Sequence, residues 1–533
     1  MTRRISIFDT TLRDGAQTQG VKFSLADKKV IAGALDRLGV DYIEGGWPGG
    51  NPQDDEFFAN PPSFEHSRLV AFGMTKRADA SAGNDLGLTS LLQTQAQMCI
   101  VGKTWDFHVE TALRISLEEN LELIRASLQH LCSSGREVMF DAEHFFDGYR
   151  ANPDYALRCL ESAFETDVRY VILCDTNGGG IPSQIAKTVD VVVQRFGGER
   201  LGIHTHNDTG NAIANTLMAV EAGVSQVQGT LNGLGERCGN ADILTVMTNL
   251  SLKMGYDIGP AAERLHLLRA TSKLLDDRLA RESLAQRPYV GDSAFAHKAG
   301  LHASAMARDA RTYEHLSPQL VGNARQIIIS DQSGRANLVE QLKNLGYKDV
   351  VEDKVTQLLK RLKSEEAKGF SYDGATASFQ LLVGEVLDNR PDFFNLMRYS
   401  VAATRRKDRL GEIVTETEVT VQVAMPDGRE VHRVAMGNGP VNAMDLAMKS
   451  ALCTFYPVLE KVNLLDYKVR IMPPDSSDTG TAAMTRVRIE SALGDDPSTI
   501  TQGVSTNVLD ASYFAMRDIY RHILWQEFRK EQA

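Results

Sequence analysis

A repeated pattern over residues 1–275 constrains the fold of this 533-residue chain more than any other feature. A short apolar run is followed by a polar or Gly-rich turn and then by a segment with helical apolar spacing. The apolar runs are Ile5–Phe8, Val40–Ile43, Leu69–Phe72, Met98–Val101, Val138–Phe140, Tyr170–Leu173, Leu201–Ile203 and Val224–Val227. The clearest helical segments are Ser24–Leu38, Leu117–Leu131, Ala156–Phe164 and Ile213–Ala222. Eight strands spaced by helices over this length predict a (β/α)8 TIM barrel, with a doubly wound open sheet as the alternative.

Reactive side chains gather where these runs end, and their placement favours the closed barrel. They are Arg13 and Asp14, Glu44, Lys76 and Arg77, Lys103, Glu143 and His144, Asp175 and Thr176, His204 and His206, and Glu236 with Asn240. In a barrel of this kind the active site is built at the C-terminal ends of the strands. We therefore expect these side chains to surround one barrel mouth.

The rest of the chain follows two other patterns. Residues 276–372 are charged and helical, which predicts a helical linker region, and residues 373–533 are rich in strands, which predicts an α+β domain. The linker helices are expected at Asn337–Leu345 and Val355–Lys368. In the tail, strands are expected at Glu418–Ala424, Tyr467–Ile471 and Thr485–Ile489, and helices at Asn442–Phe455 and Asp510–Trp525. Each group of strands adjoins a helix, so we expect one strand–helix unit used twice, in a regulatory or dimerising domain.

Composition narrows the class of protein. A net charge of −11 argues against a nucleic-acid binder, because phosphate binding needs a basic surface. No apolar stretch approaches the roughly 20 residues that span a bilayer, and Asp9 interrupts the N-terminus before a signal-like core could form. The six cysteines form no C-x-x-C pair, which suggests reduced thiols. We expect a cytoplasmic enzyme without nucleic-acid or membrane partners.

A candidate metal site is formed by His204-Thr205-His206. At a strand end, positions i and i+2 project to the same side, so both imidazoles can reach one ion. Asp14 is the matching acid, and Asn240, at the end of a Gly-rich loop, could add an amide oxygen. Such ligands suit Zn²⁺, Mn²⁺ or related ions, whereas the alternative is two ordinary polar histidines.

Three further residues are candidates for catalysis. Arg13 could face the oxyanion that develops on a carbonyl substrate. Glu143 is followed by Phe145-Phe146, and partial removal from water would suit it to general-base work; a salt-bridged acid at the strand end is the alternative. His302 lies beyond the barrel and could act only if its segment folds over a barrel mouth, which a partner subunit could supply.

These motifs together resemble the acyl-CoA-condensing branch of the DRE-TIM metallolyases, which comprises 2-isopropylmalate, homocitrate and citramalate synthases. The resemblance is carried by Leu12-Arg13-Asp14-Gly15-x-Gln17, by His204-x-His206-Asn207-Asp208-x-Gly210, by the Gly-Glu-Arg-Cys-Gly-Asn loop ending at Asn240, and by Gly437–Ala443 and Gly503–Asn507. Within this branch the chain looks most like the long citramalate synthases, through Glu44–Gly49, Asp141–Tyr149 and Cys174–Gly179.

The resemblance implies a Claisen-type condensation of acetyl-CoA with a 2-oxo acid, followed by thioester hydrolysis. It implies a divalent ion (Mn²⁺, Mg²⁺, Zn²⁺ or Co²⁺) on Asp14, His204 and His206, with Asn240 as a fourth contact. By the same resemblance, Arg13 stabilises the oxyanion, Thr176 contacts the substrate carboxylate, and Glu143 deprotonates the acetyl methyl group. His302 and Tyr313 match linker residues, His302 matching one that a neighbouring subunit supplies. The tail resembles the family's feedback domain, which implies a homodimer and an end-product amino acid as effector.

The substrate is predicted from bulk near the strand ends. Trp47 and Phe145-Phe146 would favour pyruvate over branched 2-oxo acids, although one methylene is worth only about 1–3 kcal/mol in a pocket. A citramalate product would point to isoleucine as the effector. The alternatives are a larger 2-oxo acid, a metal-dependent lyase of the same superfamily, or an amino-acid-binding protein with an inactive barrel. Gly235-Glu236-Arg237 and the long tail favour the condensing branch over the lyases.

Overall fold

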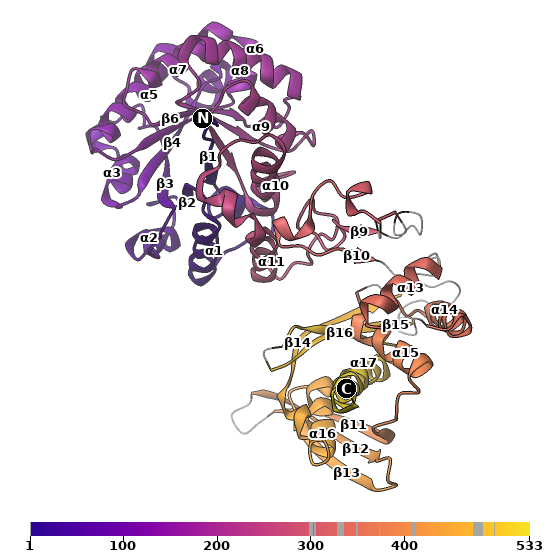
Figure 1. Ribbon diagram of the computed structural model, residues 1–533. Helices are drawn as coiled ribbons and strands as arrows, with labels where there is room; N and C mark the ends of the chain where they lie inside the picture. The colour runs from indigo at the N-terminus through magenta and orange to yellow at the C-terminus, as the bar shows by residue number, and fades with distance from the viewer. Residues whose placement is uncertain are drawn as a thin grey trace. The chain divides into compact units, whose positions relative to one another are not determined.

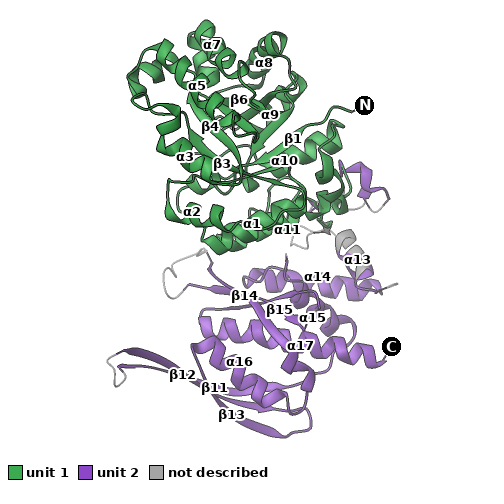
Figure 2. Ribbon diagram, turned by 90° about the vertical axis from the view of Figure 1, so that its left-hand side faces the viewer, with its two compact units in different colours: residues 1–295, 316–325 green, residues 296–315, 326–533 purple. Residues whose placement is uncertain are grey.

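The computed structural model describes residues 2–297, 302, 305–306, 308–327, 335–347, 350–372, 374–407, 412–472, 483–494 and 496–532. They form two compact units (Figure 2). The first contains residues 1–295 and 316–325, and the second contains residues 296–315 and 326–533.

The first unit is a closed parallel barrel with strand order β1 to β8 (Figure 1). The strands are β1 (Ser6–Asp9), β2 (Tyr42–Gly46), β3 (Arg68–Met74), β4 (Gln97–Lys103), β5 (Val138–Glu143), β6 (Tyr170–Asp175), β7 (Leu201–Thr205) and β8 (Gln226–Gly229). Pairing of β1 with both β2 and β8 closes the sheet. Each predicted apolar run overlaps one strand, which confirms the barrel and excludes the open sheet.

Helices surround the strands (Figure 1). They are α1 (Leu25–Leu38), α2 (Pro52–Ala59), α3 (Leu86–Gln93), α4 (Asp106–His108), α5 (Leu117–Cys132), α6 (Phe145–Ala151), α7 (Pro153–Phe164), α8 (Pro182–Phe196), α9 (Ala212–Glu221), α10 (Ile243–Thr248) and α11 (Leu268–Arg278). Local sequence sets their limits. A capping box of Ser24 with Asp27 starts α1, and Gly39 in the left-handed region ends it.

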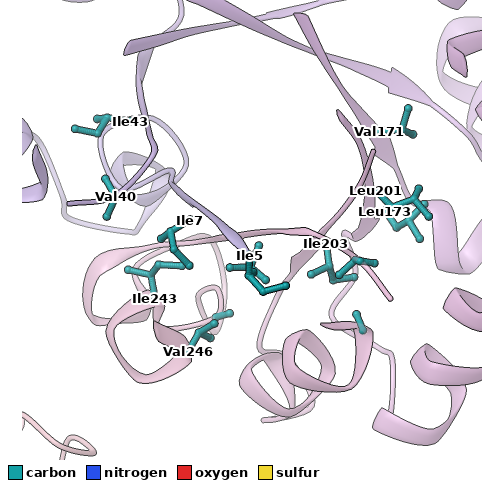
Figure 3. Close-up of a cluster of buried hydrophobic side chains, with 14 of the residues drawn as sticks. Ile5, Ile7, Val40, Ile43, Val171, Leu173, Leu201, Ile203, Ile243 and Val246 are labelled. Atoms are coloured by element: carbon teal, nitrogen blue, oxygen red, sulfur yellow. The ribbon is translucent and has the colours of Figure 1, made fainter. Parts of the chain in front are cut away.

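The barrel has two hydrophobic layers because strand side chains alternate between its faces. Residues such as Ile5, Ile7 and Ile203 pack between strands and helices (Figure 3). A second cluster consists of Phe8, Tyr42, Val70, Cys99, Met139, Tyr170, Ile172 and Cys174, each at most 6% exposed. Two positions beyond Tyr42 and Met139, the strands carry the buried acids Glu44 and Asp141. A polar layer therefore lies toward the C-terminal strand ends.

The second unit begins with a short pair, β9 (Ala296–His297) with β10 (Gln326–Ile327). Three helices follow: α13 (Arg335–Asn344), α14 (Glu352–Ala367) and α15 (Thr376–Leu387). The described residues then form two three-stranded antiparallel sheets, each followed by a helix. The first group is β11 (Asn395–Lys407), β12 (Ile413–Ala424), β13 (Glu430–Gly437) and α16 (Pro440–Leu452). The second is β14 (Val462–Ile471), β15 (Thr485–Leu493), β16 (Thr499–Ser505) and α17 (Val508–Gln532).

This arrangement confirms the predicted unit that is used twice. The helix α16 packs against β12 and β13, and α17 packs against β15 and β16. Side chains of both groups, such as Val421, Met444, Ile489 and Met516, share one hydrophobic core. Within the described residues, no helix is long and apolar enough to cross a membrane.

Candidate active site

The turn after β1 brings Arg13 and Asp14 to the barrel mouth. Asp9, the last residue of β1, is fully buried and accepts hydrogen bonds from the Thr11 backbone N–H and Oγ1, both at 2.9 Å. The Asp14 backbone N–H donates to the Thr10 carbonyl at 2.9 Å. These contacts fix the backbone that presents the two side chains.

Asp14, His204 and His206 converge, as the sequence predicts. His204 Nε2 lies 3.2 Å from Asp14 Oδ2 and 3.3 Å from His206 Nε2. All three residues are at least nine-tenths buried. Two ligand atoms that each lie about 2.1 Å from one ion, at about 90–110° to each other, are about 3.0–3.4 Å apart. The observed spacing therefore fits a single divalent ion.

The remaining polar atoms of this group also fit a metal ion. Asn240 Nδ2 lies 2.6 Å from Asp14 Oδ2 and 3.3 Å from His204 Nε2, while its buried Oδ1 has no hydrogen-bond partner. Rotating the amide by 180° would put Oδ1 among the ligand atoms, so Asn240 could be a fourth ligand.

Two of the three side chains favour the ionisation state that suits a metal site, whereas the hydrogen bond with Asp14 raises the pKa of His204, although burial alone would lower it. Burial, and then the neighbouring His204, lower the pKa of His206 to about 3. Although burial alone would raise it, Arg13 and the two imidazoles hold the pKa of Asp14 well below its usual range. A neutral imidazole and an ionised carboxylate are the forms that bind metal ions.

Arg13 is held on three sides. Its Nε donates to Glu44 Oε2 at 2.7 Å, its Nη1 lies 3.6 Å from Asp14 Oδ1, and its guanidinium lies 3.8 Å from the centre of the Phe72 ring. Glu44 is fully buried, and burial raises its pKa to about 7. The guanidinium is thus fixed in place beside the three predicted metal ligands.

A second group of possible ligands, Glu44, Cys99 and Asp141, lies deeper in the barrel, with one ligand atom of each within 4.8 Å of the others. Burial raises the pKa of the Cys99 thiol and of the Asp141 carboxyl, and Glu44 is already paired with Arg13. Burial therefore favours their protonated forms, which makes this group a poorer cation site than the Asp14 group.

Glu143 ends β5 and forms an ion pair with Lys103, with Oε2 2.5 Å from Nζ. This contact is the salt-bridged alternative that the sequence left open, and the general-base role stays a prediction. Thr176 follows β6. Its Oγ1 accepts from the His144 backbone N–H at 2.8 Å, and its carbonyl accepts from Arg237 Nη2 at 2.8 Å.

The two predicted pocket residues occupy different environments. Trp47 is 36% exposed and packs edge-to-face on Phe72, with ring centres 5.5 Å apart. Phe145 is fully buried in the layer between strands and helices, where it packs on Phe146 and Tyr149. Phe145 therefore lies in the core rather than on an accessible wall, because α6 directs its first side chain inward. Its contact with substrate stays a prediction.

His302 and Tyr313 both lie in the second unit. Their rings stack, with centres 4.0 Å apart and planes 27° apart. The structure thus brings these two predicted residues together with each other. Their role in the active site stays a prediction.

Three buried residues near this site were given no role from sequence: Phe72, Asp141 and Gln228. Gln228 Oε1 lies 2.7 Å from His204 Nδ1, and Gln228 Nε2 lies 3.1 Å from Asp141 Oδ1. A signal for Gln228 was present, because Gln226 and Gln228 flank Val227 at the end of the predicted run Val224–Val227. Phe72 gave no signal, since an apolar residue in a strand is ordinary.

Comparison with known proteins identifies the family. A family model described as HMGL-like matches residues 4–274, one described as homocitrate synthase post-HMGL domain-like matches residues 289–369, and one described as LeuA allosteric (dimerisation) domain matches residues 373–524. The chain is 44% identical over 522 residues to the (R)-citramalate synthase of Aquifex aeolicus, covering 97% of both chains. It is 45% identical over 520 residues to that of Geobacter sulfurreducens, covering 96% of both.

A 2-isopropylmalate synthase of Pelotomaculum thermopropionicum is more distant, with 28% identity over 530 residues, 98% of this chain and 99% of the relative. The identity to these two (R)-citramalate synthases is 44–45%, against 28% to this isopropylmalate synthase. The chain belongs to the (R)-citramalate synthase family, with an HMGL-like barrel and a LeuA allosteric (dimerisation) domain.

Proposed function

We propose that the protein condenses acetyl-CoA with pyruvate and hydrolyses the thioester, giving (R)-citramalate and CoA. Identity of 44–45% to (R)-citramalate synthases over nearly the whole chain supports this reaction. The observation that carries the chemistry is the convergence of Asp14, His204 and His206 on one point beside the fixed guanidinium of Arg13.

The first task of the site is to hold the oxo acid and make its keto carbon electrophilic. A divalent ion on Asp14, His204 and His206, with Asn240 as a fourth contact, would polarise the keto group. Arg13 meets the negative charge that develops on the keto oxygen. Because Arg13 is already fixed by its neighbours, little reorganisation is needed during the reaction. Thr176 contacts the substrate carboxylate.

The second task is to form the new carbon–carbon bond. Glu143 takes a proton from the acetyl methyl group, whose carbon then bonds to the keto carbon of pyruvate while the keto C=O π bond breaks and its oxygen takes up a proton. The place of Glu143 at the C-terminal end of β5, where barrel active sites are built, supports this role. Water then cleaves the thioester and releases CoA. The stacked His302 and Tyr313 complete the site from a neighbouring subunit.

The preference for pyruvate is supported by aromatic bulk beside Arg13. Phe72 covers the guanidinium, and Trp47 packs on Phe72, so we propose that this bulk limits the size of the oxo acid. Larger 2-oxo acids would then be poorer substrates.

The rest of the chain is assigned as follows. We propose a catalytic domain over residues 1–275, a linker over residues 276–372 that contributes to the active site, and a regulatory domain over residues 373–533. The LeuA match supports a homodimer with an amino-acid effector, and a citramalate product makes isoleucine the proposed effector. Isoleucine should therefore inhibit at lower concentration than leucine.

The test is acetyl-CoA-dependent thiol release by the purified chain. Pyruvate, 2-oxobutyrate, 2-oxoisovalerate and 2-oxoglutarate are each supplied with Mn²⁺ or with chelator, and products are identified by mass spectrometry. We expect Mn²⁺-dependent release with pyruvate and a citramalate product, and loss of release in His206→Ala. Preference for a larger oxo acid would overturn the substrate assignment, and no release with any of them would overturn the condensation and favour the lyase alternative.

A further inference from the structure

Gln228 lies directly behind a predicted metal ligand. It is on β8, is fully buried, and its Oε1 is 2.7 Å from Nδ1 of His204. The other ring nitrogen of His204, Nε2, faces Asp14 and His206. The two sides of this imidazole therefore have separate partners, one toward the predicted metal ligands and one toward the barrel interior.

The orientation of the Gln228 amide is itself fixed. Its Nε2 lies 3.1 Å from Asp141 Oδ1 on β5, three strands away around the barrel. In the structure Gln228 Nε2 donates to Asp141 Oδ1, and Oε1 is left to accept from Nδ1 of His204. The result is a chain of two hydrogen bonds that links β5, β8 and β7.

These two hydrogen bonds determine which nitrogen of His204 carries the proton. A neutral imidazole has one N–H, and only the other nitrogen has a lone pair for an ion. With Oε1 of Gln228 accepting at Nδ1, the proton stays on Nδ1 and the lone pair of Nε2 points to Asp14 and His206. Such partners of metal-binding histidines typically change metal affinity 10–100-fold when removed.

We infer that Gln228, oriented by Asp141, is a positioning residue that sets the tautomer and ring orientation of His204 for metal binding. In many metal sites a carboxylate or a backbone carbonyl accepts the hydrogen bond from the second ring nitrogen of the ligand histidine. Here the neutral amide of Gln228 accepts it. This inference rests on the metal site of the proposed function. Gln228 does not contact the substrate in this role.

The same strand provides a matched control. Gln226 is also fully buried and, two positions earlier on β8, points to the same side of the sheet. Its Nε2 lies 3.4 Å from Met139 Sδ, not against a histidine. Replacing either glutamine by methionine keeps the side-chain length and removes the amide, but only position 228 would lose a partner of His204.

The experiment measures Mn²⁺ binding to the chelator-stripped full-length chain, using the electron paramagnetic resonance signal of free Mn²⁺. Gln228→Met should weaken binding about 10–100-fold, while Gln226→Met should change it less than about twofold. The visible spectrum of the Co²⁺-loaded protein should change in Gln228→Met only. Raising the Mn²⁺ concentration should restore most thiol release to Gln228→Met. If this variant fails to fold by circular dichroism, Gln228→Asn, one methylene too short to reach Nδ1, carries the same expectation.

Two results would overturn the inference alone: unchanged Mn²⁺ affinity in the position-228 variant, or equal weakening in Gln226→Met. If the wild-type chain binds no Mn²⁺, this inference and the metal site of the proposed function are both overturned. Wild-type binding with Mn²⁺-dependent turnover, but an unaffected Gln228→Met, would leave the proposed function intact.

Discussion

The ionisation of His522 should contribute to the pH dependence of stability in the second unit. His522 lies on α17, is 1% exposed, and its Nε2 is 2.6 Å from Gln380 Oε1 on α15. Burial lowers the pKa of His522 from 6.5 to about 4. In the unfolded chain the ring takes up a proton at higher pH than in the folded chain. The stability that this neutral histidine contributes is therefore complete above pH 6.5 and is lost as the pH falls toward 4.

The size of this effect follows from the two pKa values. They are about 2.5 pH units apart, and one unit is worth about 1.36 kcal/mol, so the full effect is about 3 kcal/mol. Most of it, about 2.5 kcal/mol, should appear between pH 7.5 and pH 4.5. His522→Gln keeps a donor that can reach Gln380 but cannot titrate. The unfolding free energy of this variant should therefore not show the fall of about 2.5 kcal/mol between pH 7.5 and pH 4.5.

The measurement is urea unfolding followed by pulsed hydrogen exchange on peptides of α17, so that the barrel does not contribute to the signal. Wild type should lose about 2.5 kcal/mol more than His522→Gln between pH 7.5 and pH 4.5. His432→Gln, at an exposed position on β13, is the control for the substitution itself. Parallel pH profiles for wild type and His522→Gln would refute the reasoning.

Three further predictions concern the active site and are read out by thiol release and Mn²⁺ titration. Arg13→Lys loses the Nε contact with Glu44 and should lower kcat about 100–1,000-fold with Mn²⁺ affinity nearly unchanged; undiminished kcat would contradict the oxyanion role. Glu143→Gln should lower kcat about 10²–10⁴-fold, and turnover at the wild-type rate would remove it as the base. Gly235→Ala would place Cβ 2.1 Å from Asn240 Oδ1 and should weaken Mn²⁺ binding, whereas Ala at Gly179, where a Cβ meets no atom within 4 Å, should not.

The barrel could be predicted because its strands are buried on both faces. Such strands read as continuous apolar runs, and all eight were visible in the sequence. The order of reactive residues after those runs placed Asp14, His204 and His206 at one end of the sheet, where the structure brings them together. Local pattern was sufficient here because the parallel topology itself gathers the strand ends.

The contacts between side chains could not be predicted in the same way. The pairing of Arg13 with Glu44 joins the turn after β1 to the strand β2, and its geometry depends on how the barrel closes. The edge-to-face packing of Trp47 on Phe72 has no sequence signal, since aromatic residues near strand ends are common. Phe145 is fully buried, which its position at a strand end did not reveal, because that position does not fix the direction of the first helical side chain; its contact with substrate stays a prediction.

The doubled unit of the C-terminal domain has a consequence for how that domain could be shortened or divided. Val419 and Val423 of one half and Val487 and Ile519 of the other belong to a single core, so neither half encloses its own apolar side chains. Cutting the chain between α16 and β14 would expose that core on both fragments rather than release two small domains. The two halves repeat a pattern along the chain, yet they form one indivisible folding unit.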